Sequence, residues 1–306
     1  SENPLFDQSY PNYYITGLAG KFNKVMLAGT GGDELFGGYP WRYYRAVQND
    51  DFEHYIEKYY RYWQRLIPNR IIKKAFAPVW DDVKDVSTQD IFRDVFSTHA
   101  ENLTRPEDYV THSLYFEAKT FLHGLFVVED KLGMAHSLET RFPFMDNDLV
   151  EFAMKLPVRH KLGNLGEVLK IDENEAGAKT SQYFQKTNDG KLLLRKVMKR
   201  HVDEKVTERE KQGFSAPDAS WFKGESMNFV QRLIGDKKAR IWNFMDFTVM
   251  NQLVNEHLEG QKNHRLLIWS LLNIEVFLEK NNNLFQNSLP VHNVEVMPSM
   301  GHRKIS

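Results

Sequence analysis

The stretch KVMLAGTGGDELFGGYP, residues 24–40, carries most of what the sequence says about the fold. Its first five residues, KVMLA, are short, apolar and closed by a glycine, which is typical of a buried strand in a parallel sheet covered on both faces. The glycine-rich segment that follows predicts a turn opening into a helix, with Asp33 and Glu34 adjacent at its edge. We therefore expect a strand over 24–28 and a glycine-rich loop over 28–38.

Beyond this loop the hydrophobic pattern is helical. In DDFEHYIEKYYRYWQRLI the apolar and aromatic residues recur at i, i+3 and i+4 over 52–63, which predicts an amphipathic helix with an aromatic core face. Further helices are predicted over 11–22, 108–127, 146–155, 190–203, 226–234, 246–258 and 264–280. A lone strand would leave its backbone groups unpaired. Either weak strands are hidden in the sequence, or the chain is the C-terminal part of a larger α/β unit.

The predicted fold class is α/β, with this chain mostly α-helical and carrying the last strand or strands of a parallel sheet. Residues 1–280 are expected to form one domain, with a helical region over 40–280. Polar or irregular stretches separate the helices at 81–90 and at 163–189, and the second is rich in Gly, Asn and Asp, which indicates a surface insertion. Residues 281–306 are predicted to be a tail.

Composition excludes several classes of function. The 306 residues contain no cysteine, which excludes disulfides, thiolate catalysis and cysteine-based zinc sites within this chain. A formal net charge of −1 gives no global field that would attract nucleic acid or an acidic membrane. No apolar run approaches the roughly 18 residues of a membrane span, and the N-terminus lacks a signal-peptide pattern. We therefore expect a soluble cytoplasmic protein that binds neither nucleic acid nor membrane.

The glycine-rich loop has two physical interpretations. Gly29, Gly31 and Gly32 permit positive φ and a close approach of phosphate to the backbone N–H groups, helped by the dipole of the following helix. Asp33 would repel a bare phosphate but would suit Mg²⁺, which binds carboxylate and phosphate oxygens together. In the second interpretation GTGGD is merely a tight turn and Asp33 is a helix N-cap.

Three further blocks follow the loop in order: EDKLGMAHSLETRFPFMDNDLVEFAMKLP at 129–157, KLLLRKVM at 191–198 and REKQGFSAPDASWF at 209–222. Together with LAGTGGDELFGGY they resemble the synthetase domain of the asparagine synthetase family. The resemblance implies an adenine nucleotide alpha hydrolase-like fold, a parallel sheet flanked by helices. It also implies that ATP adenylates a carboxylate, aspartate or a related acid, with release of pyrophosphate. Ammonia from the glutamine hydrolysed by a glutaminase domain then attacks the acyl-adenylate.

The resemblance also assigns roles in the loop. Ala28 and Gly29 lie where the family contacts ATP, and Gly31 and Gly32 belong to the same nucleotide-binding turn. Asp33 lies where the family binds Mg²⁺ and pyrophosphate. The implied cofactors are therefore ATP and Mg²⁺.

Three residues are the catalytic candidates. Lys211 matches the lysine that reaches the phosphates in the adenylation transition state, a role that suits a compact cation, and its alternative is a flexible surface lysine. Asp130 matches an aspartate near the active site. Thr30 stands where asparagine-forming members carry Glu, and a threonine cannot act as a general base near neutral pH. In the same block, Glu139 and Arg141 are predicted to form a buried ion pair, with Asp146 as a helix N-cap.

The sequence departs from the family pattern in what it lacks. The S-G-G-x-D-S phosphate loop and the glutaminase cysteine do not occur in these residues. We expect an N-terminally truncated chain or a gene fragment, inactive alone and dependent on an upstream glutaminase domain, and a homodimer is compatible with this reading. Thr30 and Ala28 favour a divergent relative of the β-lactam-synthetase kind, or one that amidates a cell-envelope sugar acid. The remaining alternative is a non-catalytic helical interaction module.

Overall fold

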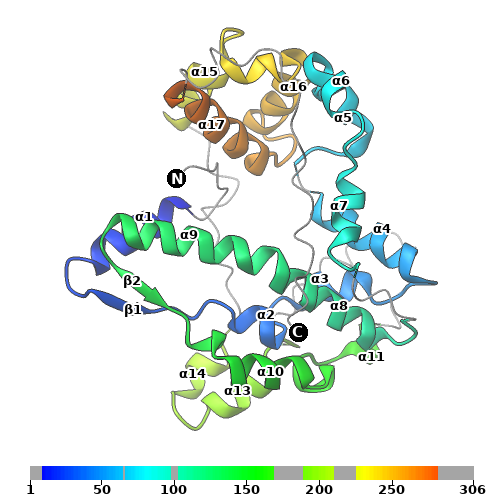
Figure 1. Cartoon of the computed structure of the whole chain (residues 1–306), viewed down its shortest axis with the longest axis vertical. Helices are drawn as coiled ribbons and strands as arrows, with labels where there is room; N and C mark the ends of the chain where they lie inside the picture. Colours follow the sequence, from blue (N-terminus) through cyan, green and yellow to red (C-terminus); the bar gives the residue numbers. More distant parts are fainter. Residues whose placement is uncertain (1–8, 65, 98–102, 169–188, 210–224, 282–306) are drawn as a thin grey trace, which may run out of the picture.

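The computed structural model describes residues 9–64, 66–97, 103–168, 189–209 and 225–281. Over these residues the chain is mostly helical and contains a sheet of two parallel strands, β1 (Val25–Leu27) and β2 (Glu139–Arg141). Figure 1 shows this sheet beside the long helix α9 (Phe121–Ala135). The prediction of a mainly helical chain with a parallel strand is confirmed.

The second strand answers the question raised by the lone predicted one. β1 pairs with β2 in a register that sets Val25 opposite Glu139 and Leu27 opposite Arg141. β2 has the sequence ETR, three residues without an apolar pattern, so pairing with β1 rather than local preference holds it extended. The first of the two alternatives given above, a weak strand hidden in the sequence, is therefore confirmed.

One face of this sheet is covered and the other is open among the described residues. Met26 and Thr140 share a face in the register, and Thr140 Oγ1 would lie 3.1 Å from a Cβ placed at Gly133 of α9. On the opposite face Val25 is 43% exposed and Leu27 is 69% exposed. The prediction of a strand buried on both faces is therefore wrong for this part of the chain, because α9 packs on a single face.

Helix α1 (Ser9–Ala19), predicted over 11–22, lies along α9 (Figure 1). The Tyr13 ring lies 4.5 Å from the His136 ring, and the Thr16 hydroxyl donates to the carbonyl of Leu132 over 3.3 Å. These contacts anchor the chain just before it enters β1.

The central core is aromatic. Helix α4 (Phe52–Trp63) follows the predicted pattern, and its residues Tyr55, Ile56, Tyr59 and Tyr60 are buried. They pack with side chains of α7 (Thr88–Asp94) and α8 (Pro106–Lys119). The single helix predicted over 108–127 is two helices, because the chain breaks at Thr120 between α8 and α9. Before α4 lie two short helices, α2 (Gly32–Phe36) and α3 (Pro40–Tyr43).

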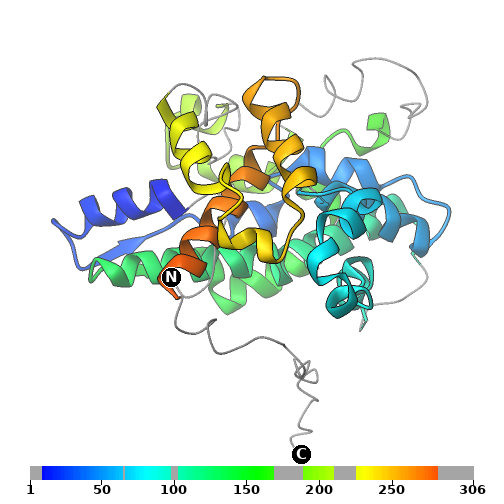
Figure 2. The ribbon, with the colours of Figure 1, turned by 90° about the horizontal axis from the view of Figure 1, so that it is seen from above.

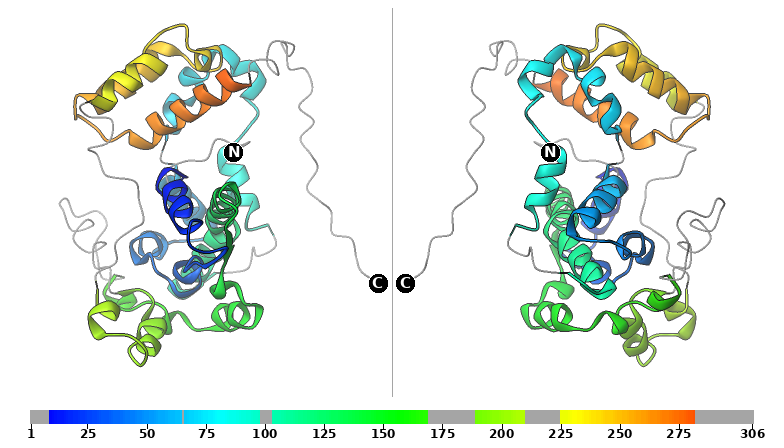
Figure 3. Two further views of the ribbon diagram at one scale, coloured as in Figure 1. Left: turned by 90° about the vertical axis from the view of Figure 1, so that its left-hand side faces the viewer. Right: turned by 90° about the vertical axis from the view of Figure 1, so that its right-hand side faces the viewer.

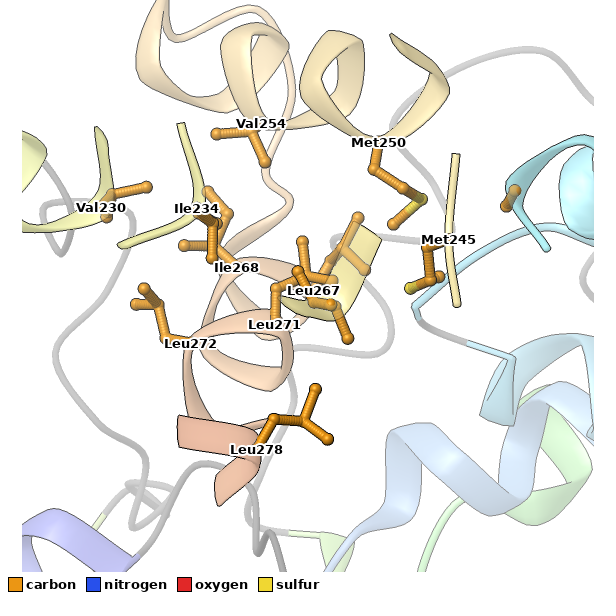
Figure 4. Close-up of a cluster of buried hydrophobic side chains, with 12 residues drawn as sticks. Val230, Ile234, Met245, Met250, Val254, Leu267, Ile268, Leu271, Leu272 and Leu278 are labelled. Carbon is orange, nitrogen blue, oxygen red and sulfur yellow. The ribbon is translucent and has the colours of Figure 1, made fainter. Parts of the chain in front are cut away.

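A separate hydrophobic cluster gathers the C-terminal helices α15 (Glu225–Ile234), α16 (Phe247–Leu258) and α17 (Arg265–Lys280). Figure 2 and Figure 3 show these helices grouped together, and Figure 4 shows side chains from all three meeting around Ile268 and Leu271. Helix α5 (Asn69–Ala75) joins them through the buried Ala75. A segment between α4 and α7 therefore packs with helices from residues 225–280.

The remaining elements correct two predicted boundaries. Helices α6 (Trp80–Val83) and α7 occupy much of 81–90, a stretch predicted to be polar or irregular. Of the predicted insertion 163–189, residues 169–188 lie outside the described residues, and α11 (Leu165–Val168) opens it. Residues 282–306 of the predicted tail also lie outside. The other helices are α10 (Asn147–Lys155), α13 (Leu192–Met198), α14 (Glu204–Thr207) and the 3₁₀ turns Tyr44–Ala46, Ala77–Val79, Pro143–Met145, Val158–His160 and Arg240–Asn243.

In the described parts of the chain, none of the helices combines the length and apolar character needed to cross a membrane.

Candidate active site

The glycine-rich loop leaves the sheet at the carboxyl end of β1, the edge where open α/β sheets bind ligands. The N–H of Ala28 donates to the carbonyl of Arg141 over 2.9 Å, so the loop begins where the strand pairing ends. Gly31 has φ 97°, and a Cβ there would overlap the Met145 side chain. Glycine is therefore required at position 31 by backbone conformation and by packing.

The first part of this loop is open. A Cβ at Gly29 would meet no atom within 4 Å. Within the described residues, the N–H groups of Gly29, Thr30 and Gly31 have no hydrogen-bond partner. Successive unpaired N–H groups of this kind form a concavity suited to an anion. The turn thus offers the donors that a phosphate needs.

Gly32 and the following helix depart from the prediction. Gly32 lies where a Cβ would come within 3.0 Å of the Phe144 ring, so its small size serves packing. Of Gly29, Gly31 and Gly32, only Gly31 adopts the positive φ that glycine permits. Helix α2 spans five residues, so its dipole is weak, and the loop's own N–H groups are the stronger attraction for an anion.

Asp33 lies against a cation from another sequence block. Lys191 Nζ is 2.8 Å from Asp33 Oδ1, and the Lys191 N–H donates to the carbonyl of Phe36 over 3.1 Å. A Cβ at Gly38 would overlap the same carboxylate oxygen, so Gly38 makes room for Asp33. The fold therefore brings the loop and the KLLLRKVM block together at this carboxylate, a pairing that sequence reasoning did not foresee.

The carboxylate of Asp33 also fits Mg²⁺ in one coordination mode. The described residues contain no cluster of three or more His, Cys, Asp or Glu side chains that could hold a metal ion. Mg²⁺ is nevertheless commonly held by one or two carboxylates, with substrate phosphates and water as its other ligands. Asp33 beside the open N–H groups of the loop fits that mode, with Lys191 as a neighbouring countercharge.

Thr30 reaches across to α9. Its hydroxyl donates a 2.6 Å hydrogen bond to Oε1 of Glu129, which is 99 residues away in the sequence. Burial raises the pKa of Glu129, and the hydrogen bond from Thr30 acts in the opposite direction. The other carboxylate oxygen, Oε2, is buried and has no hydrogen-bond partner among the described residues. The loop position that carries no acid therefore has one supplied to it by the neighbouring helix.

Asp130, the residue that the sequence predicted for the site, is the next residue after Glu129 on α9, and its side chain is exposed. Successive residues on a helix are turned by about 100° from each other, so Asp130 and Glu129 point in different directions. Sequence reasoning selected Asp130, which stays a prediction, and did not single out Glu129, the residue of this pair that contacts the loop. A signal was available in the adjacent acids ED at 129–130, read together with the missing loop acid at position 30.

Glu34, the second acid of the loop, turns into the core. It is 2% exposed, and burial raises its pKa while the charge of Arg42 opposes the rise. Arg42 in turn bonds Glu117 of α8, with its Nη1 donating to Oε2 over 3.1 Å. The adjacent acids Asp33 and Glu34 therefore have different surroundings: Asp33 contacts Lys191, and Glu34 is buried near Arg42.

Three other residues of the block 129–157 have structural contacts. The predicted ion pair of Glu139 and Arg141 exists at 2.9 Å, but both side chains are more than half exposed, so the prediction of a buried pair is wrong. The two residues lie on the open face of the sheet. Asp146 accepts from the N–H of Leu149 over 3.2 Å, which confirms it as the N-cap of α10.

Lys211 falls on residues 210–224, outside the described residues. The chain leading to it is held by Arg195 of α13, which donates to the carbonyls of Thr207 and Arg209. Arg195 belongs to the KLLLRKVM block, so that block also supports the approach to the next one.

Comparison with known proteins gives sequence matches along most of the chain. A family model described as asparagine synthase matches residues 1–279. Asparagine synthetase [glutamine-hydrolyzing] 1 of Bacillus subtilis (strain 168) is 26% identical over 297 residues, which cover 89% of this chain and 43% of that protein. Asparagine synthetase [glutamine-hydrolyzing] 3 of the same strain is 28% identical over 142 residues, 45% of this chain and 21% of that protein. The amidase chyE of Penicillium rubens is 21% identical over 164 residues, 53% and 22% of the two chains. The chain spans less than half the length of these curated relatives.

Proposed function

The chain belongs to the asparagine synthase family, and on this premise we propose that it serves an ATP-dependent amide-forming ligase. The ligase activates a carboxylate as an acyl-adenylate with release of pyrophosphate, and ammonia derived from glutamine displaces AMP. One observation carries the proposal: at the carboxyl end of a parallel strand, three adjacent N–H groups that have no hydrogen-bond partner among the described residues precede the carboxylate of Asp33.

The loop is the nucleotide-binding element of this proposal. Ala28 and Gly29 contact ATP, and Gly29 is the position with open space around it. Gly31 and Gly32 let the turn pack on Phe144 and Met145, and thereby hold the N–H groups toward the phosphates. The adenine nucleotide alpha hydrolase-like fold, in which further parallel strands flank β1, is part of the same proposal.

Asp33 holds Mg²⁺ with the phosphates of ATP. The ion, when bound, neutralises the phosphate charge and so favours departure of pyrophosphate. Lys191 lies at the same carboxylate and balances its charge in the absence of the ion. Lys211 brings a second cation to the pyrophosphate as negative charge develops on it.

The identity of the acid substrate is less well determined than the nucleotide-binding residues. Aspartate or a related acid is the first choice, and Asp130, exposed on α9, is accessible to a polar substrate group. Thr30 in place of an acid favours a relative of the β-lactam-synthetase kind, or one that amidates a cell-envelope sugar acid. These substrates and a non-catalytic interaction module are separated by one assay.

The assay is ATP–pyrophosphate exchange, measured with the protein as its gene encodes it and a panel of candidate acids. The acid that supports exchange is the substrate class. Asp33→Asn and Lys211→Ala are each expected to lower exchange about 10²–10³-fold, because each removes charge stabilisation from the transition state. The 306 residues alone are expected to be inactive, since they contain no S-G-G-x-D-S loop.

Matched controls are Asp148→Asn and Lys155→Ala, an exposed acid and an exposed lysine of α10. Both are expected to keep the exchange rate of the unaltered protein. Unchanged exchange in both site variants would overturn the site assignment. Absence of exchange with every acid would favour the non-catalytic module.

A further inference from the structure

The contact between Thr30 and Glu129 joins the loop to α9 at the place where the proposed chemistry occurs. The hydroxyl of Thr30 uses one oxygen of the carboxylate, at 2.6 Å. The second oxygen, Oε2, is buried without a donor in the described parts of the chain. An unsatisfied buried acceptor costs free energy, and the cost is larger when the group is charged. The arrangement is therefore a poor device for stability, and an oxygen kept free beside a ligand loop has another use.

We propose that Glu129 is the general base of amide formation and that Thr30 is the positioning residue that holds its carboxylate toward the reacting amine. The inference rests on the proposed function, and it assigns to α9 the carboxylate that the loop itself lacks at position 30. Glu129 lies on a helix and is hydrogen-bonded to a turn whose N–H groups at positions 29–31 have no partner in the part of the chain that the structure describes.

The step conserves atoms and charge. The lone pair of the amine nitrogen forms a bond to the acyl carbon, and the bond from that carbon to the AMP oxygen breaks. AMP leaves with the electron pair of the broken bond. One proton passes from the nitrogen to Oε2 of Glu129, which becomes a neutral carboxylic acid and later returns the proton to water. Oε1 remains the acceptor for Thr30 throughout.

The surroundings of Glu129 suit a base. Burial raises its pKa, which brings its proton affinity closer to the operating pH and makes it a stronger acceptor than an exposed glutamate. The hydrogen bond from Thr30 favours the charged form and limits the rise in pKa. Of the nearby carboxylates, Asp130 is exposed and Asp33 pairs with Lys191. Helix α1 contacts the end of α9 through Tyr13, which packs on His136, and through Thr16, which donates to the carbonyl of Leu132.

Other carboxylates of the region are less suited to this role. Glu34 is buried beside Arg42, away from solvent, and Asp33 is held by Lys191 near Gly38. Asp130 is exposed and makes no hydrogen bond to the loop within the described residues, whereas Glu129 is hydrogen-bonded to it directly. Glu129 is thus the acid that the described structure connects to the position of the missing one.

The test separates the two half-reactions in the protein as its gene encodes it. ATP–pyrophosphate exchange reports adenylation alone, and amide formation with ammonium as the nucleophile reports the second step. The key variant is Glu129→Gln, because the amide oxygen of glutamine still accepts from Thr30 but cannot take up a proton. We expect exchange at the rate of the unaltered protein and amide formation lowered about 10²–10⁴-fold.

Companion variants distinguish chemistry from architecture. Thr30→Val, which removes the hydroxyl at nearly constant shape, is expected to lower amide formation by less than Glu129→Gln, and Thr30→Ser is expected to restore it. Hydroxylamine, whose adduct loses its proton more readily than that of ammonia, is expected to recover product formation in Glu129→Gln. A purely structural role would not respond to the nucleophile.

Two results would overturn the inference: amide formation by Glu129→Gln at the unaltered rate, or equal loss of exchange and amide formation with both nucleophiles. Either result leaves the proposed function standing, because exchange in the unaltered protein tests that function independently. Exchange that fails in the unaltered protein refutes the proposed function, and the inference that rests on it falls as well.

Discussion

Two glutamates on successive helices, Glu117 of α8 and Glu129 of α9, have opposite surroundings. Glu117 is fully buried and accepts from three donors: Arg42 Nη1 at 3.1 Å, the Tyr59 hydroxyl at 3.0 Å and the Tyr43 hydroxyl at 3.3 Å. Glu129 is half-buried, accepts from Thr30 alone among the described residues, and keeps one oxygen free. A saturated carboxylate is part of the architecture, whereas a partly satisfied one beside an open turn is available for chemistry.

The neighbours of each glutamate reinforce this difference. The guanidinium of Arg42 lies 3.7 Å from the centre of the Tyr39 ring and 4.6 Å from that of Phe121, so aromatic rings enclose the ion pair with Glu117. The Thr30 turn instead has empty space around Gly29. Substitutions in the enclosed cluster should therefore change stability, and substitutions in the turn should change activity.

The largest effect on stability is expected from Glu117→Ala. The change removes the partner of a buried arginine and leaves the charge of Arg42 uncompensated, which costs about 3–5 kcal/mol of unfolding free energy. Urea unfolding followed by circular dichroism measures it. Tyr59→Phe, which removes one neutral donor to the same carboxylate, is the graded control and should cost less. A loss below 1 kcal/mol in Glu117→Ala would break the comparison, because the cluster would then not hold the helices together.

The second effect is a dependence of stability on pH. Burial raises the pKa of Glu117 from its ordinary 4.5 to about 7, and Arg42 opposes the rise. Because the folded-state pKa lies above the unfolded one, the contribution of Glu117 is fully present below pH 4.5 and is lost as pH rises to about 7. The loss amounts to about 3 kcal/mol.

The measurement is the difference in unfolding free energy between the unaltered protein and Glu117→Gln, followed from pH 4 to pH 8. Burial also raises the pKa values of Glu34 and Glu129, and the subtraction removes their common contribution. A flat difference over this window would show that Glu117 keeps its charge when buried, with Arg42 outweighing burial.

The helices that were predicted well have strong local patterns. The aromatic period of 52–63 and the N-cap Asp146 located α4 and α10 within the chain, since each signal lies in the residues that form the helix. Strand β2 gave no such signal, because three polar-rich residues become a strand only through pairing with β1. The break at Thr120 was missed because apolar residues continue through it.

The candidate site also has features that local sequence patterns predicted and features that they did not. The position of the loop was predictable from glycine spacing after an apolar strand, as was the carboxylate of Asp33. Its contact with Lys191, and that of Thr30 with Glu129, join segments about a hundred residues or more apart in the sequence. Such contacts follow from how α9 and α13 pack on the loop, and no local pattern encodes them.

The smallest expected effect sharpens the comparison most. Glu129→Gln should change the unfolding free energy by no more than about 1 kcal/mol, against the several kcal/mol expected for Glu117→Ala. Glutamine keeps the acceptor for Thr30 and removes a charge whose burial is unfavourable, while its NH₂ group places a new donor where Oε2 had no partner. These contributions oppose each other. Urea unfolding at pH 7 measures the sum, with the exposed Glu151→Gln of α10 as the matched control. A loss as large as that of Glu117→Ala would mean that Glu129 is an architectural residue, and that its free oxygen is paired by a group outside the described residues.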